Sequence, residues 1–309
     1  MSFSWNGVFP ALTTPFTADD RLDLALFEKN ILAQQAAGIK GVVIAGSLGE
    51  ASTLDLEETA QLTKHALSVL KGAIPVIVNI AEGSTRNAVK AAQQAQNWGA
   101  DGLMLLPPMR YRSTPEETIT YFKTVAASTD LPILLYNNPH DYKVEITLDM
   151  FDQLVDIPNI EAVKESTRDV TNVTRMKNRF GDRFKILCGV DTLTLEELAG
   201  GADGLVAGLV DALPAETVAI FNLAKAGRYD EARAIYRWFM PLLEFDIDPQ
   251  LVQYIKLVSL YTGIGNEYVR APRLPLSGTV KAAAIRIIEA ALASRPHLPE
   301  YLGLEFANK

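Results

Sequence analysis

The sequence predicts an α/β fold, a (β/α)8 barrel of the TIM type followed by a C-terminal helical extension. Eight short runs rich in β-branched and other apolar residues alternate with segments of helical periodicity. Several of these runs are apolar throughout, as expected for parallel strands that are covered on both faces. Eight such units fit the roughly 200 to 250 residues of one barrel. We place the barrel at residues 1–226 and the extension at 227–309, as one structural unit.

The expected strands are the runs 8–13, 41–45, 75–79, 102–105, 132–136, 160–164, 185–189 and 204–208. The segments between them carry apolar residues three or four positions apart, as at Leu24, Phe27 and Ile31. Segment 214–226 supplies the eighth helix. The runs 228–240, 249–262 and 278–294 have the same helical pattern and form the extension.

The joints between helices and strands repeat in sequence. Segment 99–103, Gly-Ala-Asp-Gly-Leu, recurs unchanged at 201–205, and a looser version lies at 37–41. Glycine after a helix supplies a left-handed C-cap, so the repeat indicates one structural device used several times.

A doubly wound open sheet is the alternative fold. We prefer the barrel because no glycine-rich phosphate-binding fingerprint follows the first strand, where the chain reads Thr13, Thr14 and Pro15. The segment 263–268, Gly-Ile-Gly-Asn-Glu-Tyr, lacks the last glycine of such a fingerprint and has no strand before it.

Composition favours a small-molecule partner. The 309 residues include 29 basic and 37 acidic side chains, and the formal charge of −8 disfavours a nucleic-acid or anionic-membrane surface. The one cysteine, Cys188, lies in an apolar run and excludes an internal disulfide. With no leader-like N-terminus and no apolar run long enough to span a bilayer, we expect a cytoplasmic protein. The three histidines lack ligand spacing, so we expect no metal.

Lys164 is the first candidate catalytic residue. It ends an apolar strand and is followed by the polar residues Glu165, Ser166 and Thr167. Removal from water disfavours the ammonium form, so a lysine in this place can be a nucleophile toward a carbonyl or cyclic imine. This feature alone leaves open a strand-end lysine that pairs with a carboxylate. Lys256, within an apolar helical stretch, is interpreted as structural.

Other polar strand ends would meet at the same face of the barrel. Gly46, Ser47 and Leu48 follow the second strand, and the amides of this glycine-flanked loop can face a carboxylate. Tyr136 ends the fifth strand and is followed by Asn137, Asn138 and Pro139, where its phenol can carry protons for an imine-forming lysine. An ordinary turn cap for Ser47 and a core aromatic for Tyr136 are the alternatives.

The seventh and eighth strands end in small residues, Gly189 and Gly208, which leave space for a substrate. Asp191 and Asp211 follow them, and we interpret both as helix N-caps.

Taken in order, the segments 46–50 (Gly-Ser-Leu-Gly-Glu), 136–139 (Tyr-Asn-Asn-Pro) and 164–166 (Lys-Glu-Ser) resemble the dihydrodipicolinate synthase and N-acetylneuraminate lyase family. The resemblance covers the whole chain. It implies a class I Schiff-base enzyme that acts on a 2-oxo acid or cyclic imino acid without metal or other cofactor, as a homo-oligomer, tetramer or dimer. It further implies that Lys164 forms the imine, Tyr136 moves protons, and Ser47 with its loop amides holds the substrate carboxylate. Gly46, Leu48, Asn138, Gly189 and Gly208 would complete the substrate site.

Three departures from the synthase pattern narrow the choice among the members of this family. The synthase has two consecutive threonines in its glycine loop, an arginine after its Tyr-Asn-x-Pro motif and a tyrosine pair after strand four. This chain instead has Ser47-Leu48, His-Asp-Tyr at 140–142 and Pro-Pro-Met-Arg-Tyr at 107–111. These features, with segments 251–257 and 269–276, look more similar to the branch called 1-pyrroline-4-hydroxy-2-carboxylate deaminase. That branch forms 2-oxoglutarate semialdehyde and ammonia in hydroxyproline breakdown.

Two other functions remain open from the sequence. A 2-oxo acid aldolase or sugar-acid dehydratase would use the same lysine on an open-chain substrate. A regulatory barrel that binds a metabolite without reaction is the non-enzymatic alternative, and the presence of both Lys164 and Tyr136 argues against it.

Overall fold

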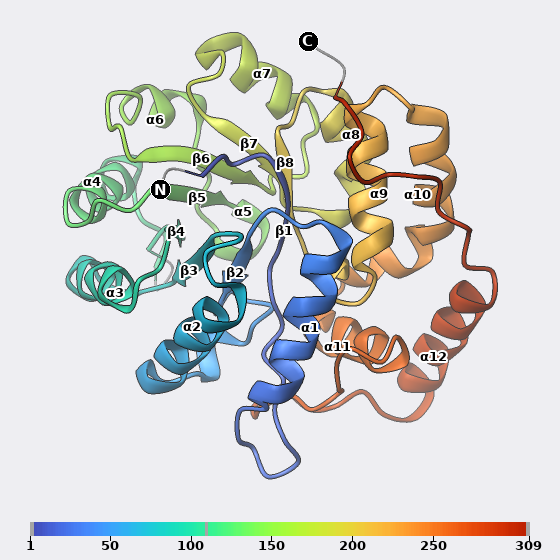
Figure 1. Cartoon of the computed structure of the whole chain (residues 1–309). Coiled ribbons are helices and arrows are strands. Elements are labelled where there is room, and N and C mark those ends of the chain that lie inside the picture. Colours follow the sequence, from blue (N-terminus) through green and yellow to red (C-terminus); the bar gives the residue numbers. More distant parts are fainter. Residues whose placement is uncertain (1–2, 109–110, 307–309) are drawn as a thin grey trace.

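The computed structural model describes residues 3–108 and 111–306, which form a barrel of parallel strands surrounded by helices (Figure 1). This confirms the predicted fold class. The strands are β1 (Gly7–Pro10), β2 (Val42–Ile44), β3 (Val76–Ile80), β4 (Gly102–Leu105), β5 (Ile133–Asn137), β6 (Ile160–Glu165), β7 (Lys185–Cys188) and β8 (Gly204–Ala207). Each lies within three residues of its predicted bounds at either end.

Neighbouring strands pair in parallel around the barrel in the order β1-β8-β7-β6-β5-β4-β3-β2. The seam between β1 and β2 is held just beyond β1, by a parallel bridge between Ala11 and Val43 in which Leu12 N donates to Val43 O at 2.9 Å. Pro10, two residues before Leu12, has no N–H to add another hydrogen bond on that side. The barrel is therefore nearly closed. The few hydrogen bonds between β1 and β2 are explained in part by the missing N–H of Pro10.

Twelve α-helices lie within the described residues. They are α1 (Leu24–Ala37), α2 (Leu56–Leu70), α3 (Thr85–Trp98), α4 (Pro115–Ala126), α5 (Pro139–Tyr142), α6 (Leu148–Asp152), α7 (Thr171–Phe180), α8 (Thr194–Ala199), α9 (Pro214–Lys225), α10 (Tyr229–Leu243), α11 (Leu251–Tyr261) and α12 (Gly278–Ala293). Four short 3-10 helices add η1 (Ala51–Thr53), η2 (Asp191–Leu193), η3 (Leu209–Asp211) and η4 (Glu244–Ile247). None of the described helices is both long enough and apolar enough to cross a membrane.

The C-terminal helices α10, α11 and α12 lie together on one side of the barrel (Figure 1). Helix α10 packs on α9 and α12, and α11 contacts η3 and η4. These are the helices predicted from 228–240, 249–262 and 278–294. The division of the chain between residues 226 and 227 stays a prediction, although η4 of the extension reaches the ends of the barrel strands.

The repeated joints have a shared hydrogen-bond device beyond the glycine cap. Asp101, before β4, accepts from Val76 N at 2.9 Å and donates its own N–H to Val76 O. Asp203, before β8, does the same with Ile186 at 2.9 Å. Each aspartate thus fixes the start of its strand against the preceding one, while Gly99 ends α3 in the left-handed conformation at φ 92°.

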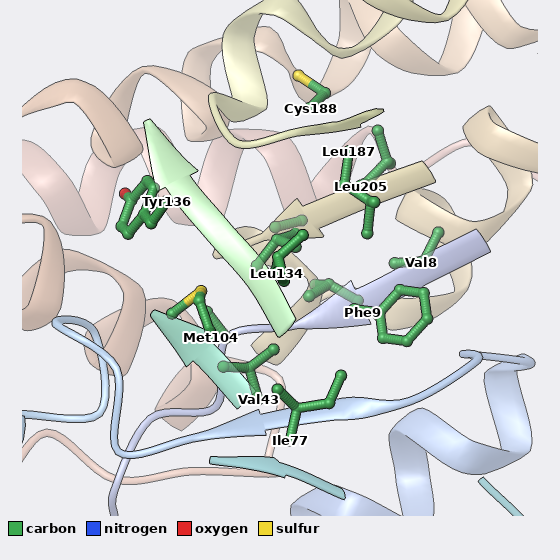
Figure 2. Close-up of a cluster of buried hydrophobic side chains, with 14 of the residues drawn as sticks. Val8, Phe9, Val43, Ile77, Met104, Leu134, Tyr136, Leu187, Cys188 and Leu205 are labelled. Atoms are coloured by element: carbon green, nitrogen blue, oxygen red, sulfur yellow. The ribbon is translucent and has the colours of Figure 1, made fainter. Parts of the chain in front are cut away.

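Apolar side chains from several strands fill the barrel (Figure 2). Phe9, Val43, Ile77, Leu134 and Leu187 are buried almost completely. Burying a side chain of this size stabilises the fold by about 1.5–3 kcal/mol relative to its exposed state. This packing closes the barrel interior, so an open polar pocket remains only beyond it, where the strands end.

Candidate active site

Lys164 lies on β6 with its side chain almost fully buried, 7% exposed. It pairs with Tyr136 on β5 and with Leu187 on β7 in the strand register, and its Nζ lies 4.2 Å from the centre of the Tyr136 ring. Burial is the main cause that lowers the pKa of Lys164, and nearby acidic groups oppose that effect. The amine is therefore held toward its neutral, nucleophilic form.

The Lys164 amine faces a pocket at the C-terminal ends of the strands, with about 680 Å³ of empty space including its open mouth. All eight residues predicted for the site line this pocket: Gly46, Ser47, Leu48, Tyr136, Asn138, Lys164, Gly189 and Gly208. They come from the ends of β2, β5, β6, β7 and β8. The structure thus brings the predicted residues together, while their individual roles stay predictions.

Tyr136 is held by the residues that follow it. Its hydroxyl accepts a hydrogen bond from Asn138 Nδ2 at 3.2 Å, and the same amide donates to Asp141 Oδ2 at 2.8 Å. The Asn138 Oδ1 also accepts from Asp141 N, which caps the short helix α5. Burial raises the pKa of Tyr136 to about 12, and the Asn138 hydrogen bond opposes this. Asn138 therefore orients the phenol, while burial keeps it protonated near neutral pH.

A second phenol, which sequence reasoning missed, completes this side of the pocket. Tyr142 on α5 shares a hydrogen bond of 2.5 Å between its hydroxyl and Ser47 Oγ. The Tyr142 ring meets Tyr136 edge-on, with centroids 5.3 Å apart at 79°. Burial is the main cause that raises the pKa of Tyr142. Tyr136, Tyr142 and Ser47 thus place three hydroxyl groups around one amine.

The two strand-end glycines make room for the protein's own atoms. A Cβ on Gly189 would lie 2.2 Å from Ser166 Oγ and 2.6 Å from Lys164 Cγ. A Cβ on Gly208 would lie 2.8 Å from Asp246 Oδ1. The sequence predicted that these glycines leave space for a substrate. Their backbones do line the pocket, but the close contacts show that glycine is needed there to seat Lys164 and Asp246.

The N-cap interpretation of two aspartates is wrong. Asp191 accepts from Leu209 N at 2.7 Å and also from Gly208 N, so it ties the end of β7 to the end of β8. Asp211 accepts from Thr13 N and Gln34 Nε2, both at 2.8 Å. Neither side chain caps the helix that follows it. Their donors are the backbone amides of Gly208, Leu209 and Thr13 and the Gln34 side chain, all from other parts of the barrel.

A family model described as the dihydrodipicolinate synthetase family matches residues 4–291. The chain belongs to this family. It is 35% identical over 288 residues to a 4-hydroxy-tetrahydrodipicolinate synthase of Exiguobacterium sibiricum, covering 92% of this chain and 96% of that protein. A protein of the same name from Methanosarcina barkeri is 30% identical over 276 residues, covering 89% and 94%. The solved structure of a synthase from Methylacidiphilum fumariolicum superimposes with a TM-score of 0.88 at 29% identity, covering 94% and 98%.

As a member of this lyase family the protein is an enzyme, and one basic group of its pocket was not among the sequence candidates. Arg168, four residues past Lys164, is exposed and lines the pocket. It is the first basic residue along the chain after β6. Met109 and Arg110 of the motif after strand four lie outside the described residues.

Lys256 has the structural role that its apolar surroundings indicated. Its Nζ lies 2.5 Å from Glu50 Oε1, and the side chains of Lys256 and Glu50 are both buried. The same Nζ donates to Tyr268 O at 2.6 Å. Glu50 also accepts from Arg270 N at 3.0 Å. This ion pair fixes α11 to the loop that carries Ser47, so the extension and the glycine loop are positioned together.

Proposed function

We propose that this family member is a Schiff-base deaminase that converts 1-pyrroline-4-hydroxy-2-carboxylate to 2-oxoglutarate semialdehyde and ammonia. The observation that carries the Schiff-base chemistry is the buried Lys164 amine, 4.2 Å from the Tyr136 ring and facing the pocket. The choice of substrate is supported by the groups around it. Leu48, 5% exposed, gives the pocket an apolar wall beside Ser47, where the synthase resemblance implies a second hydroxyl.

In the first step the Lys164 nitrogen attacks C2 of the cyclic imine. A bond forms between this nitrogen and C2, and the bond between C2 and the ring nitrogen breaks. The ring nitrogen leaves as a primary amine on C5, and C2 becomes an imine of Lys164. A neutral lysine is required for this attack, which agrees with the lowered pKa of Lys164.

The lysine imine then draws electrons from C3. A proton leaves C3, and the C4 hydroxyl departs as water after taking up a proton. A proton moves from C5 to C3, which leaves an enamine between C4 and C5. Its imine tautomer is hydrolysed to the aldehyde and ammonia, and water releases the 2-oxo group from Lys164. One water is lost and two are consumed, so the net reaction adds one water and releases one ammonia.

Protonated phenols suit these transfers. Tyr136 lies against Lys164, and Tyr142 with Ser47 forms a second donor pair on the same side of the pocket. A general acid or base within hydrogen-bond reach contributes about 10²- to 10⁴-fold to rate. We assign Tyr136 to the protons nearest the imine, with the Ser47–Tyr142 pair beside the substrate carboxylate or the departing hydroxyl.

A second candidate is formation of 4-hydroxy-tetrahydrodipicolinate. The names of the curated relatives favour it, and so does Arg168, which could hold the carboxylate of a second substrate. Residues 140–142 do not supply an arginine to this pocket, and Asp141 and Tyr142 stand there instead. A 2-oxo acid aldolase or sugar-acid dehydratase would use the same Lys164 amine.

One experiment separates these functions. The protein is incubated in turn with pyruvate, a 2-oxo-3-deoxy sugar acid and the hydroxylated pyrroline carboxylate, then reduced with borohydride and weighed, while ammonia is measured. Ammonia released only from the pyrroline supports the deaminase. Absence of ammonia from the pyrroline, together with pyruvate as a product or with turnover of pyruvate, rejects the deaminase in favour of the aldolase or the synthase.

The covalent route has its own control. Lys164→Ala should abolish both turnover and borohydride trapping, whereas Lys123→Ala, which removes an exposed lysine of α4, should leave both unchanged. Turnover that survives in Lys164→Ala would reject the Schiff base. We also propose a homo-oligomer, dimer or tetramer, which light scattering on the eluted protein would test.

A further inference from the structure

The C-terminal extension places one acidic side chain at the active-site pocket. Asp246 lies on η4, beyond the barrel, and lines the pocket together with Ile247 and Leu251. Its Oδ2 accepts a hydrogen bond from Asp191 N at 3.1 Å. Its Oδ1 lies over Gly208, whose missing side chain makes room for it. The position of this carboxylate is thus fixed by two strand ends.

One oxygen of Asp246 is left for a ligand. Among residues 3–108 and 111–306, no donor makes a hydrogen bond to Oδ1, while both oxygens of the neighbouring Asp191 accept from the amides of Gly208 and Leu209. Both oxygens of Asp191 are therefore occupied by the protein, whereas Oδ1 of Asp246 is not. An acceptor at the edge of a polar pocket that lacks a donor is suited to a hydrogen-bonding or cationic ligand.

The charged groups around Asp246 do not form a close ion pair with it in the described parts of the chain. Lys164 attracts it from β6 but is held toward neutrality by burial, and Arg168 attracts it from the pocket rim. Asp191 repels it, and burial is the main cause that raises the pKa of Asp246 to about 8. No salt bridge to Asp246 lies within 4.0 Å in the described parts of the chain. A positive charge brought by the substrate would relieve this arrangement.

The proposed reaction creates such a charge. Opening the ring frees an amine on C5, four bonds from the carbon that Lys164 holds, and an alkyl amine takes up a proton at neutral pH. A cation inside a pocket must find an acceptor or be expelled. We propose that Asp246 is the specificity residue that receives the amino group released when Lys164 opens the ring, an inference that rests on the proposed function.

The alternative role for Asp246 is structural, as an acceptor for Asp191 N. Asp246→Asn separates the two roles because the amide oxygen can still accept that hydrogen bond while the charge is lost. Asp248→Asn is the matched control. Asp248 lies at the end of the same 3-10 helix and does not line the pocket. Among the described residues, its side chain accepts only a local hydrogen bond, from Gln250 N at 2.7 Å.

The test uses a pair of probes that differ in nitrogen and cannot lose a hydroxyl group. 1-Pyrroline-2-carboxylate opens on Lys164 to an imine with a free C5 amine, and 2-oxopentanoate gives the same imine without it. Rates of borohydride trapping are measured for each probe and expressed as a ratio, so that the fraction of active protein cancels. This readout does not depend on ammonia release, so a failed deaminase assay and a failed role for Asp246 remain distinct.

We expect the wild type and Asp248→Asn to favour the pyrroline probe, and Asp246→Asn to lose about 10-fold or more of that preference, as for loss of a charge-assisted hydrogen bond. Trapping of 2-oxopentanoate should change by less than about twofold. An unchanged preference in Asp246→Asn, or an equal loss on both probes, overturns the proposal. Because the ratio is internal to each variant, partial misfolding cannot imitate the expected result.

Discussion

Replacing Gly189 by alanine should displace the Lys164 side chain while Lys164 itself stays unchanged in sequence. The backbone at Gly189 is not in the left-handed region, so alanine has no conformational penalty there. The new Cβ would lie 2.2 Å from Ser166 Oγ, 2.6 Å from Lys164 Cγ and 2.7 Å from Lys164 Cε. Carbon atoms in contact are about 3.5–4.0 Å apart, so the Lys164 side chain must move by about 1 Å.

The size of the effect follows from that displacement. Overpacking of this kind costs about 1–3 kcal/mol of folding free energy. A misplacement of about 1 Å in a reacting group lowers rate by about 10²-fold. We therefore expect Gly189→Ala to trap 2-oxopentanoate with borohydride about 100-fold more slowly, with a loss of about 1–3 kcal/mol in the free energy of unfolding measured by urea titration.

Two further variants sharpen the test. Gly200→Ala makes the same substitution outside the pocket, where the added Cβ meets its nearest atom at an ordinary 3.4 Å, and it should leave trapping unchanged. Adding Ser166→Ala to Gly189→Ala removes the closest clash but not the contacts with Lys164, so trapping should stay slow. A wild-type trapping rate in Gly189→Ala would refute the close packing of Lys164 against this glycine.

Three more predictions concern the second phenol, the buried ion pair and pH. Tyr142→Phe removes one partner of the 2.5 Å hydrogen bond to Ser47 Oγ, so turnover should fall by about 10²-fold while borohydride trapping is retained. A wild-type rate of turnover would show that the Tyr142 hydroxyl is not used. Lys256→Met leaves the buried Glu50 with only its longer ion pair, 3.7 Å to Arg273, and should cost about 3–5 kcal/mol in urea unfolding. Part of that loss should be recovered when Glu50→Gln is added, and a loss no larger than that of an exposed lysine would contradict the buried pair. Glu197 is buried, neither of its oxygens has a hydrogen-bond partner in the described parts of the chain, and burial raises its pKa to about 8 from the usual 4.5. The folded state therefore keeps a proton that the unfolded chain loses, and this contribution to stability, complete below about pH 4.5, is lost as pH rises through about 8. Glu197→Gln should flatten the fall in thermal midpoint between about pH 6 and pH 9, and an unchanged slope would exclude Glu197 as its source.

Much of the architecture could be predicted from local pattern. Each strand of the barrel is recognisable as a short apolar run, and each long helix by its periodicity. This is so because burial on both faces, or on one face, is a property of a single element. Closure into a barrel then places all the carboxyl ends of the strands at one face. For this reason Lys164, Tyr136 and Ser47 could be predicted as neighbours before any coordinates were known.

The errors and omissions concern residues whose partners lie far away in sequence. Asp191 and Asp211 look like N-caps because the local sequence indicates only the turn that follows each of them. Their hydrogen-bond donors come from the residues just past β8 and from the start of the chain. Tyr142 reaches Ser47 across 95 positions, and no periodicity marks such a pair. The short helix α5 that carries Tyr142 is too brief to give a helical pattern.

The amino-acid sequence by itself determined the barrel, the helical extension and the buried lysine at the end of the sixth strand, because these follow from the burial and polarity of consecutive residues. Only the tertiary structure decided which side chains surround Lys164. Asp246 meets Asp191 across 55 positions because η4 packs against η2, which follows the end of β7. Such a contact depends on how whole elements pack, so it cannot be predicted from the residues next to Asp246 in the sequence.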